Sequence, residues 1–321
     1  MGLLKKRFES EKINAVYSSD LTRTRVTATA LSEPRGLDIT TTEMLREVCV
    51  GEWEDISWGD IGSIYPEMSA NFGHDPAKWR VGGSEPYEDV IKRMMDFIKD
   101  TARRHDGEVI AFFSHGFAIR AFFCCLLGIS SEEVWKIKYC DNTAVALLNY
   151  DNGELTVEYQ GDNSHLSQET STFARQKWWR AEKNMATENL RYVPLDKVRD
   201  SAIINSYHLE AGKRAAADKE YAAFLEDEPV GLLGLDTEKG SNEGCGWISS
   251  IYIDPDYRDM RFGVQLIGHA ISEYRRMRRE TLWIEAPRDS IVFHLCKNYG
   301  FEVVSDKGDR LLMEKYIRNW Q

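Results

Sequence analysis

The sequence predicts a protein of two domains, an α/β domain with a parallel sheet followed by an α+β domain. Three observations predict this organisation. The chain has 321 residues, which is long for one small hydrophobic core. Its first part alternates apolar strand-like runs with amphipathic helical patterns, an order typical of parallel sheets. Near residues 165–190 this alternation of strand and helix patterns ends, and successive strand patterns joined by polar turns follow.

The first part contains strand and helix patterns in alternation. The run INAVYSS precedes a helix expected over Leu21–Leu31, and YEDVIKRMMDFIKD has apolar residues at helical spacing. Val109–Phe113 is apolar at every position, so we expect a strand covered on both faces, with a helix that opens at Gly116. TAVALLNYDNGELTVEY is typical of a hairpin that turns at Asp151–Gly153.

The second part begins after a charged and aromatic stretch at 166–189, which lacks a strand pattern. We interpret this stretch as a helical connector between a domain at 1–165 and a domain at 190–321. YAAFLEDEPVGLLGL and CGWISSIYIDP are strand patterns joined by turns rich in Glu, Asp and Gly, as in an α+β domain. The elements expected after them are a helix from about Gly263, a strand at Thr281–Glu285, a helix at Ser290–Tyr299 and a strand at Leu311–Tyr316.

Composition and charge exclude several classes of function. The net charge of -11 argues against nucleic acid as a partner. No run of eighteen uncharged apolar residues is present, and the start MGLLKKRFESEK lacks an apolar signal region. We therefore expect no membrane partner and a cytoplasmic location. The six cysteines show no CxxC pair and no histidine at zinc-finger spacing, which favours reduced thiols and no metal.

The stretch VIAFFSHGFAIRAFFCCLL places His115 between a predicted buried strand and a helix. Chemistry in open α/β sheets gathers at the carboxyl ends of strands, where helix N-termini offer amide donors to anions. A lone histidine at such a place is structural about as often as functional. However, AVYSSDLTRTRVTATAL also carries a strand into polar residues, with Arg23 one turn later, and GGSEPYEDVIKR places Glu85 ahead of Arg93.

Four ordered segments, SSDLTR, LREVCVGEWE, GGSEPYEDVIKR and SHG, resemble the motifs of the histidine phosphatase superfamily, also called phosphoglycerate-mutase-like. The resemblance implies a three-layer α/β fold for residues 1–165. It also implies that Arg23 and His115 clamp a phosphoryl group and that Glu85 protonates the leaving alkoxide. The expected ligand of this domain is phosphate or a phosphorylated molecule.

The family's nucleophile is another histidine, in an Arg-His-Gly motif on the first strand. No histidine in this sequence stands between an arginine and a glycine. The resemblance therefore predicts a domain truncated at its start, without its covalent acceptor and one central strand. We expect this half to be catalytically inactive. A truncated gene or a fragment is favoured over an evolved pseudoenzyme.

The second domain carries WISSIYIDPDYRDMRFGVQLIGHAISEYRRM, in which a strand, an Asp-Pro turn and a helix succeed one another. Backbone amides at such a turn can hold a pyrophosphate. This segment and IEAPRDSIVFHLCKNYGFEVV resemble the GNAT N-acetyltransferase family, over residues 190–318. The resemblance implies the acyl-CoA N-acyltransferase fold, with acetyl-CoA as substrate. The residues implied to bind it are Ile251, Ile253, Arg258, Arg261, Phe262, Gly263 and Val264.

Two departures from the family pattern leave alternatives open. Arg261 stands where the first glycine of the loop is expected, which restricts the backbone but adds a cation. A tyrosine often protonates the departing CoA thiolate, and Cys296 stands at its position. A buried thiol is a poor acid, so Tyr299 or water could act instead, or the step could need no acid. Tyr299 is better explained as a core aromatic, His294 as a packed or surface histidine and Glu243 as a solvated carboxylate.

These observations together predict an enzyme that transfers an acetyl group from acetyl-CoA to an amine, by direct attack within a ternary complex. The acceptor is a small-molecule amine or a peptide that the sequence does not identify. The main alternative is a phosphomonoesterase or phosphoglycerate-mutase-like enzyme whose start lies upstream of Met1. The third interpretation is a regulatory ligand-binding protein with two inactive domains.

Overall fold

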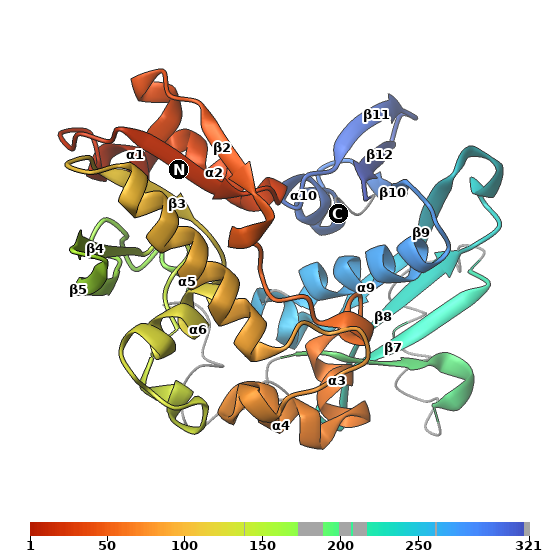
Figure 1. Cartoon of the computed structure of the whole chain (residues 1–321). Coiled ribbons are helices and arrows are strands. Elements are labelled where there is room, and N and C mark those ends of the chain that lie inside the picture. The colour runs from red at the N-terminus through yellow and green to blue at the C-terminus, as the bar shows by residue number, and fades with distance from the viewer. Residues whose placement is uncertain (138, 173–188, 199–206, 208–216, 261, 318–321) are drawn as a thin grey trace. The chain divides into compact units, whose positions relative to one another are not determined.

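The computed structural model describes residues 1–137, 139–172, 189–198, 207, 217–260 and 262–317 (Figure 1). The chain forms two compact units. Unit 1 is built mainly from Met1–Glu54 and Tyr65–Ala181, and unit 2 from Asp55–Ile64 and Glu182–Asn319. A short segment from the first part of the sequence thus belongs to unit 2, which no sequence pattern indicated. The predicted connector at 166–189 lies largely outside the described residues.

Unit 1 contains a parallel sheet with the strand order β2-β1-β3. The central strand β1 (Ala15–Ser19) pairs in parallel with β2 (Ile39–Thr42) on one side and with β3 (Ile110–Phe113) on the other. Helix α2 (Thr22–Ser32) follows β1, and helix α5 (Tyr87–Arg104) precedes β3 (Figure 1). Parallel strands joined through helices confirm the predicted α/β class.

A hairpin forms a separate sheet in unit 1, as the sequence predicted. Strands β4 (Val145–Asp151) and β5 (Glu154–Asp162) pair antiparallel. Asn152 and Gly153 both have positive φ, of 49° and 90°, which is the backbone that a tight two-residue hairpin turn requires. The other α-helices in the described part of unit 1 are α1 (Gly2–Arg7), α4 (Pro66–His74) and α6 (Gly116–Leu126).

Strand β3 differs from its prediction. An apolar run at every position led us to expect a strand covered on both faces, yet the residues of β3 are only half-buried and the preceding Val109 is 49% exposed. Among the described residues, β3 pairs with β1 alone, and the β4–β5 hairpin does not extend its sheet. The prediction of full burial was wrong, because β3 lies at the edge of the sheet that the described residues form.

An aromatic cluster forms part of the core of unit 1. Trp53 and Trp79 are 1% and 0% exposed, and their ring centroids lie 5.6 Å apart. The ring of Phe72 stacks on that of Phe117 at 4.8 Å, and Tyr65 lies 6.0 Å from Trp53. Trp53 and Tyr65 thus lie in unit 1 close to the two ends of the segment 55–64, which belongs to unit 2.

Unit 2 is built on a seven-stranded mixed sheet in the order β11-β12-β10-β9-β8-β7-β6. Its one parallel pair is β9 with β10, and the other neighbouring pairs are antiparallel. Its strands are β6 (Arg191–Pro194), β7 (Lys219–Leu225), β8 (Glu228–Asp236), β9 (Cys245–Ile253), β10 (Thr281–Pro287), β11 (Glu302–Asp306) and β12 (Arg310–Tyr316). Its described helices of α type are α3 (Trp58–Ile64), α9 (Phe262–Arg276) and α10 (Ile291–Asn298).

The core of unit 2 lies between this sheet and helices α9 and α10. Side chains of α9 such as Phe262 and Leu266 pack with Ile248 of β9 and Ile284 of β10, and all four are at most 2% exposed. The elements predicted from about Gly263 onward lie within a few residues of their expected bounds.

No described helix of either unit is long and apolar enough to cross a membrane. The short 3₁₀ helices among the residues that the structure describes are Glu33–Arg35, Glu43–Leu45, Gly51–Trp53, Pro76–Lys78, Ser131–Lys136, Leu195–Lys197, Ser241–Glu243 and Pro255–Met260.

Candidate functional site

In unit 1, polar residues gather at the carboxyl ends of β1 and β3. Ser18 of β1 lies opposite Phe113 of β3 in the parallel register, so the residues that follow the two strands are neighbours. His115 comes two residues after Phe113, caps the N-terminus of α6 and is 6% exposed. Both segments that the sequence singled out therefore end at the same edge of the sheet.

Arg23 and His115 are in direct contact. Arg23 Nε donates a hydrogen bond to Nδ1 of His115 at 3.1 Å. Because Nδ1 accepts this bond, the hydrogen of a neutral imidazole is on Nε2. Burial, with the charges of Arg23 and Arg93, lowers the pKa of His115 to about 3, so the ring is neutral near pH 7. Nε2 is buried and has no hydrogen-bond partner among the described residues, which leaves one N–H donor for a ligand.

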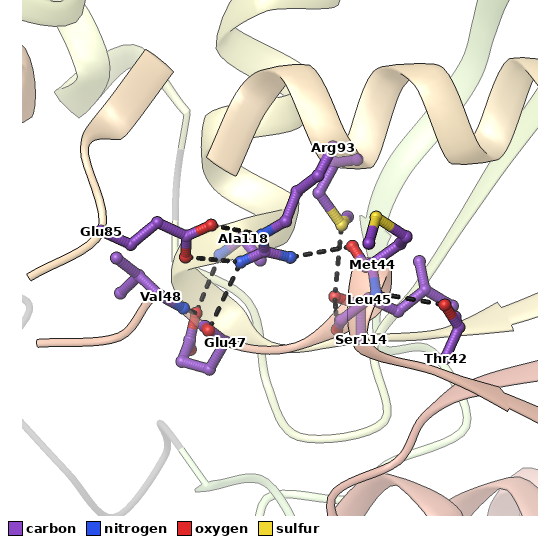
Figure 2. A network of polar contacts seen from close by, with 10 residues as sticks. Thr42, Met44, Leu45, Glu47, Val48, Glu85, Arg93, Ser114 and Ala118 are labelled. Atoms are coloured by element: carbon purple, nitrogen blue, oxygen red, sulfur yellow. Dashed lines mark hydrogen bonds and ion pairs between the residues drawn. The ribbon is translucent and has the colours of Figure 1, made fainter. Parts of the chain in front are cut away.

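Glu85 is held by an arginine. Arg93 of α5 donates to Glu85 through Nε at 2.6 Å and Nη2 at 3.0 Å (Figure 2). The same guanidinium donates to the carbonyl oxygens of Met44 and Glu47. The arrangement brings Glu85 into one network with the LRE segment. To protonate a leaving group, the Glu85 carboxylate would first have to part from Arg93.

Glu47, which no sequence pattern singled out, contacts the start of α6 through its carboxylate. Its oxygens accept backbone hydrogen bonds from Ala118 at 3.0 Å and Val48 at 3.0 Å (Figure 2). They also accept one from Phe117 at 3.2 Å. Burial raises the pKa of Glu47, although these amide groups act in the opposite direction. Two amides that a helix N-terminus would offer to an anion are thus already used. An anion at this edge would therefore depend largely on side-chain donors such as Arg23 and His115.

Three further charged residues follow or precede these strands, namely the ion pair of Arg46 with Asp20 and, inside α6, Arg120. Arg46 donates to Asp20 through Nε at 2.7 Å and Nη2 at 2.5 Å, and this contact is the main reason that the pKa of Asp20 is lowered. Arg120, the charged residue inside the apolar run after His115, is structural, because it donates to the carbonyl oxygens of Val134 and Ile137 at 2.8 Å each. The pair of Arg46 and Asp20 was not singled out from the sequence, since it joins two separate motifs.

An open hollow of about 430 Å³ lies beside Glu85, on the surface of α5. Its lining contains more acidic than basic side chains, so it is a poor place for phosphate, and His115 is not part of it. The lining residues are Met44, Glu85, Asp89, Lys92, Arg93, Asp96, Phe97 and Asp100. No group of three or more His, Cys, Asp or Glu residues in the described part of the chain could hold a metal ion.

In unit 2, the parallel strands β9 and β10 separate. They pair from Cys245 with Thr281 as far as Ile248 with Ile284. Beyond this point β9 continues along β8 and β10 along β12, so the strands diverge on either side of a wedge. A register shift between β8 and β9 at the same level adds to the bend. The predicted residues Ile251 and Ile253 lie on the β9 side of this wedge.

The turn after β9 leads into α9, as expected for the predicted cofactor loop. Arg258 donates from Nε to the carbonyl oxygen of Ile253 at 3.1 Å, so it is fixed against the end of β9. Phe262, Gly263 and Val264 form the first turn of α9. The Phe262 side chain is 1% exposed and belongs to the core. Arg261 lies outside the described residues.

Gly263 also lies close to helix α10. A Cβ atom at this position would lie 2.7 Å from Cδ2 of Leu295 on α10, which is closer than real carbon contacts. A side chain at position 263 would therefore displace the end of the Leu295 side chain, a contact that no sequence pattern indicated.

Cys296 and Tyr299 lie in or against the core of unit 2. Cys296 is 0% exposed, and burial raises the pKa of its thiol to about 12. Tyr299 packs against the same cluster, and burial raises its pKa as well. Lys315 Nζ lies 5.2 Å from the centre of the Tyr299 ring. These positions favour the structural explanation of both residues over a role as proton donor.

The sheet order, helix placement and strand separation put unit 1 in the phosphoglycerate-mutase-like class and unit 2 in the acyl-CoA N-acyltransferase class. Comparison with known families agrees with this division. The chain belongs to the Histidine phosphatase superfamily (branch 1), which matches residues 1–163, and it carries a domain of the Acetyltransferase (GNAT) family, which matches residues 176–301. Both family predictions and the fold class are confirmed.

Individual relatives cover about half of the chain. Phosphoserine phosphatase 1 of Hydrogenobacter thermophilus is 27% identical over 147 residues, which is 46% of this chain and 69% of that protein. Putative phosphoserine phosphatase 2 of the same organism is 27% identical over 168 residues, 52% of this chain and 82% of that protein. The solved structure of Bacillus stearothermophilus YhfR matches with a TM-score of 0.50 and 27% identity, covering 51% of this chain and 82% of that one.

Proposed function

We propose that the chain is an acetyl-CoA-dependent N-acetyltransferase joined to a phosphatase-like domain that binds phosphate groups without hydrolysing their esters. The separation of β9 from β10 beside the first turn of α9 carries the first part of the proposal. A wedge between two parallel strands can receive an extended pantetheine chain, with the backbone of Ile251 and Ile253 at its edge. The amides at the start of α9, with Arg258 nearby, face the pyrophosphate.

The chemistry follows from what acetyl-CoA supplies, which is a thioester with a good leaving group. A neutral amine attacks the thioester carbonyl, the C–S bond breaks as the thiolate leaves, and the nitrogen passes its proton to solvent water. Because a thiol with a pKa of about 12 is a weak acid, Cys296 does not serve as the proton donor. The thiolate leaves without a dedicated acid and takes its proton from water. Glu243 is exposed in a turn and is treated as a solvated carboxylate.

The second part of the proposal depends on the tautomer of His115. The lone pair of Nδ1 faces Arg23, and Nε2 carries the hydrogen, so this ring offers a donor and no nucleophile. None of the other histidines follows an arginine and precedes a glycine, as the family's nucleophile does. The likeness to two phosphoserine phosphatases makes phosphoserine the first ligand to test.

Calorimetry with CoA on the full chain tests the acetyltransferase assignment, and wild-type protein that binds no CoA would remove it. Hydrolysis of para-nitrophenyl phosphate tests the other half. We expect none above background, together with phosphate binding that is lost in His115→Ala and kept in His294→Ala. Hydrolysis that disappears in His115→Ala would show instead that the phosphatase half is an active phosphomonoesterase.

A further inference from the structure

The segment Asp55–Ile64 lies inside the histidine phosphatase match but is built into unit 2. Ser57 begins helix α3 as a side-chain cap, because its Oγ accepts the N–H of Asp60 at 3.1 Å. Asp60 Oδ1 in turn accepts the backbone N–H of Tyr192 in β6 at 3.2 Å. Ile61 is 1% exposed. The segment is therefore a buried and hydrogen-bonded part of this unit.

Gly59 touches the main chain just before β6. A Cβ atom on Gly59 would lie 2.7 Å from the carbonyl oxygen of Leu190. Because this oxygen belongs to the main chain, the backbone itself would have to move to relieve the contact. The N–H of the same Leu190 donates to Oε1 of Gln265 at 2.8 Å. Gln265 lies in α9 two residues after Gly263, close to the proposed pyrophosphate-binding turn. Leu190 thus joins the segment on one side to the start of α9 on the other.

The segment also holds the other end of α9. Arg276 Nη2 donates to the carbonyl oxygen of Asp55 at 2.7 Å, and Arg275 Nη1 lies 3.4 Å from its Oδ1. Both arginines are in the last turn of the helix. The two ends of α9 are therefore tied to the same short segment, at Asp55 and, through Leu190, at Ser57, whose Oγ donates to the Leu190 carbonyl oxygen at 3.2 Å.

We infer that Asp55–Ile64 is a positioning element of the acetyl-CoA site, which sets the place of the first turn of α9 through Leu190. The inference rests on the proposed acetyltransferase function. Amides bind a pyrophosphate only when they point at it together, so a small displacement of this turn lowers affinity. The residues of the segment do not touch CoA themselves; they act through Leu190 and Gln265.

Two glycines of α3 provide a matched test in the full chain. Gly59→Ala would push against Leu190, whereas a Cβ atom on Gly62 meets no other atom within 4 Å. Both changes replace a helical glycine by alanine, so their gain in helix propensity is the same. We expect Gly59→Ala to weaken CoA binding by about fivefold or more, and Gly62→Ala to leave it within about twofold of wild type.

A second pair keeps the test decisive if Gly59→Ala fails to fold. Asp60→Asn retains an oxygen acceptor for Tyr192 and should bind CoA almost as wild type, whereas Asp60→Ala should lose affinity. Calorimetry and thermal melts are recorded for every variant. A lowered melting temperature with unchanged CoA affinity in Gly59→Ala and Asp60→Ala would overturn the inference and leave the segment as packing alone. Wild-type protein without CoA binding would overturn the proposed function itself.

Discussion

Nε of Arg23 lies 3.1 Å from Nδ1 of His115, so the arginine determines which imidazole nitrogen carries the hydrogen. The ring is buried, neutral and orientated, and its Nε2–H is a donor for a ligand. This contact joins two motifs that are far apart in the sequence. It also makes the stability of unit 1 depend on pH.

Acid should destabilise unit 1 through His115. The pKa of this residue is about 3 when folded and has an ordinary value of 6.5, so the unfolded chain binds the proton first as the pH falls. The stability is complete above pH 6.5 and declines as the pH falls towards 3. Between pH 7 and pH 5 we expect a loss of about 2 kcal/mol from this group. Urea unfolding of wild type and His115→Gln checks it, and an equal decline in both proteins would contradict the prediction.

Glu47 should contribute more to stability than an exposed glutamate. Glu47→Ala leaves the N–H groups of Phe117 and Ala118 without their acceptor, and we expect a loss of about 2–4 kcal/mol in the free energy of unfolding. Glu47→Gln keeps one oxygen and should lose less. Glu154→Ala, on the exposed surface of β5, is the control in the same urea experiment. A Glu47→Ala protein as stable as that control would show that the contacts are dispensable.

Gly263 has two roles that a double variant separates. Gly263→Asp brings a side chain against Leu295 and a negative charge near the pyrophosphate, so both the melting temperature and CoA binding should fall. Adding Leu295→Ala removes the obstruction and should recover part of the packing between α9 and α10. We expect CoA binding to stay lost. Recovery of binding in the double variant, measured by calorimetry, would show that the glycine serves helix packing only.

Arg261→Gly removes a side chain and a charge from the same loop, whereas Gly263→Asp adds both. The substitution restores the glycine of the family pattern and removes one cation. We expect CoA binding to remain, weakened by on the order of 1 kcal/mol, the size of one exposed charge contact with phosphate. Loss of all detectable CoA binding would show that the cation is essential to the loop.

Cys296→Ala should affect stability and leave catalysis unchanged. The thiol is wholly buried, so its removal should cost about 1–2 kcal/mol in the free energy of unfolding. If the thiol is no proton donor, turnover with a suitable amine should match that of wild type. A fall in kcat with unchanged CoA affinity and a changed pH profile would restore Cys296 as the acid.

Local patterns predicted the elements well, and long-range contacts explain the differences. Helix α9 and the hairpin turn at Asn152 follow from periodicity and turn chemistry, which act within a few residues. Glu47 was overlooked although its motif was recognised, because its role depends on amides of α6 that lie far away in the sequence. The half-burial of β3 depends on which strands stand beside it, and an apolar run does not encode its neighbours. No periodicity shows that Gly59 meets the carbonyl of Leu190.

Unit 2 is built from two separate stretches of the sequence, and this limits how the two halves of the protein can be separated or exchanged. A gene segment that begins at residue 190 encodes all seven strands of its sheet, yet it lacks α3 and the acceptors for Arg276 and Tyr192. No single cut in the chain releases a complete unit 2. A hybrid that replaces the phosphatase-like half would need to carry Asp55–Ile64, or an equivalent loop, between the same two flanking aromatic residues.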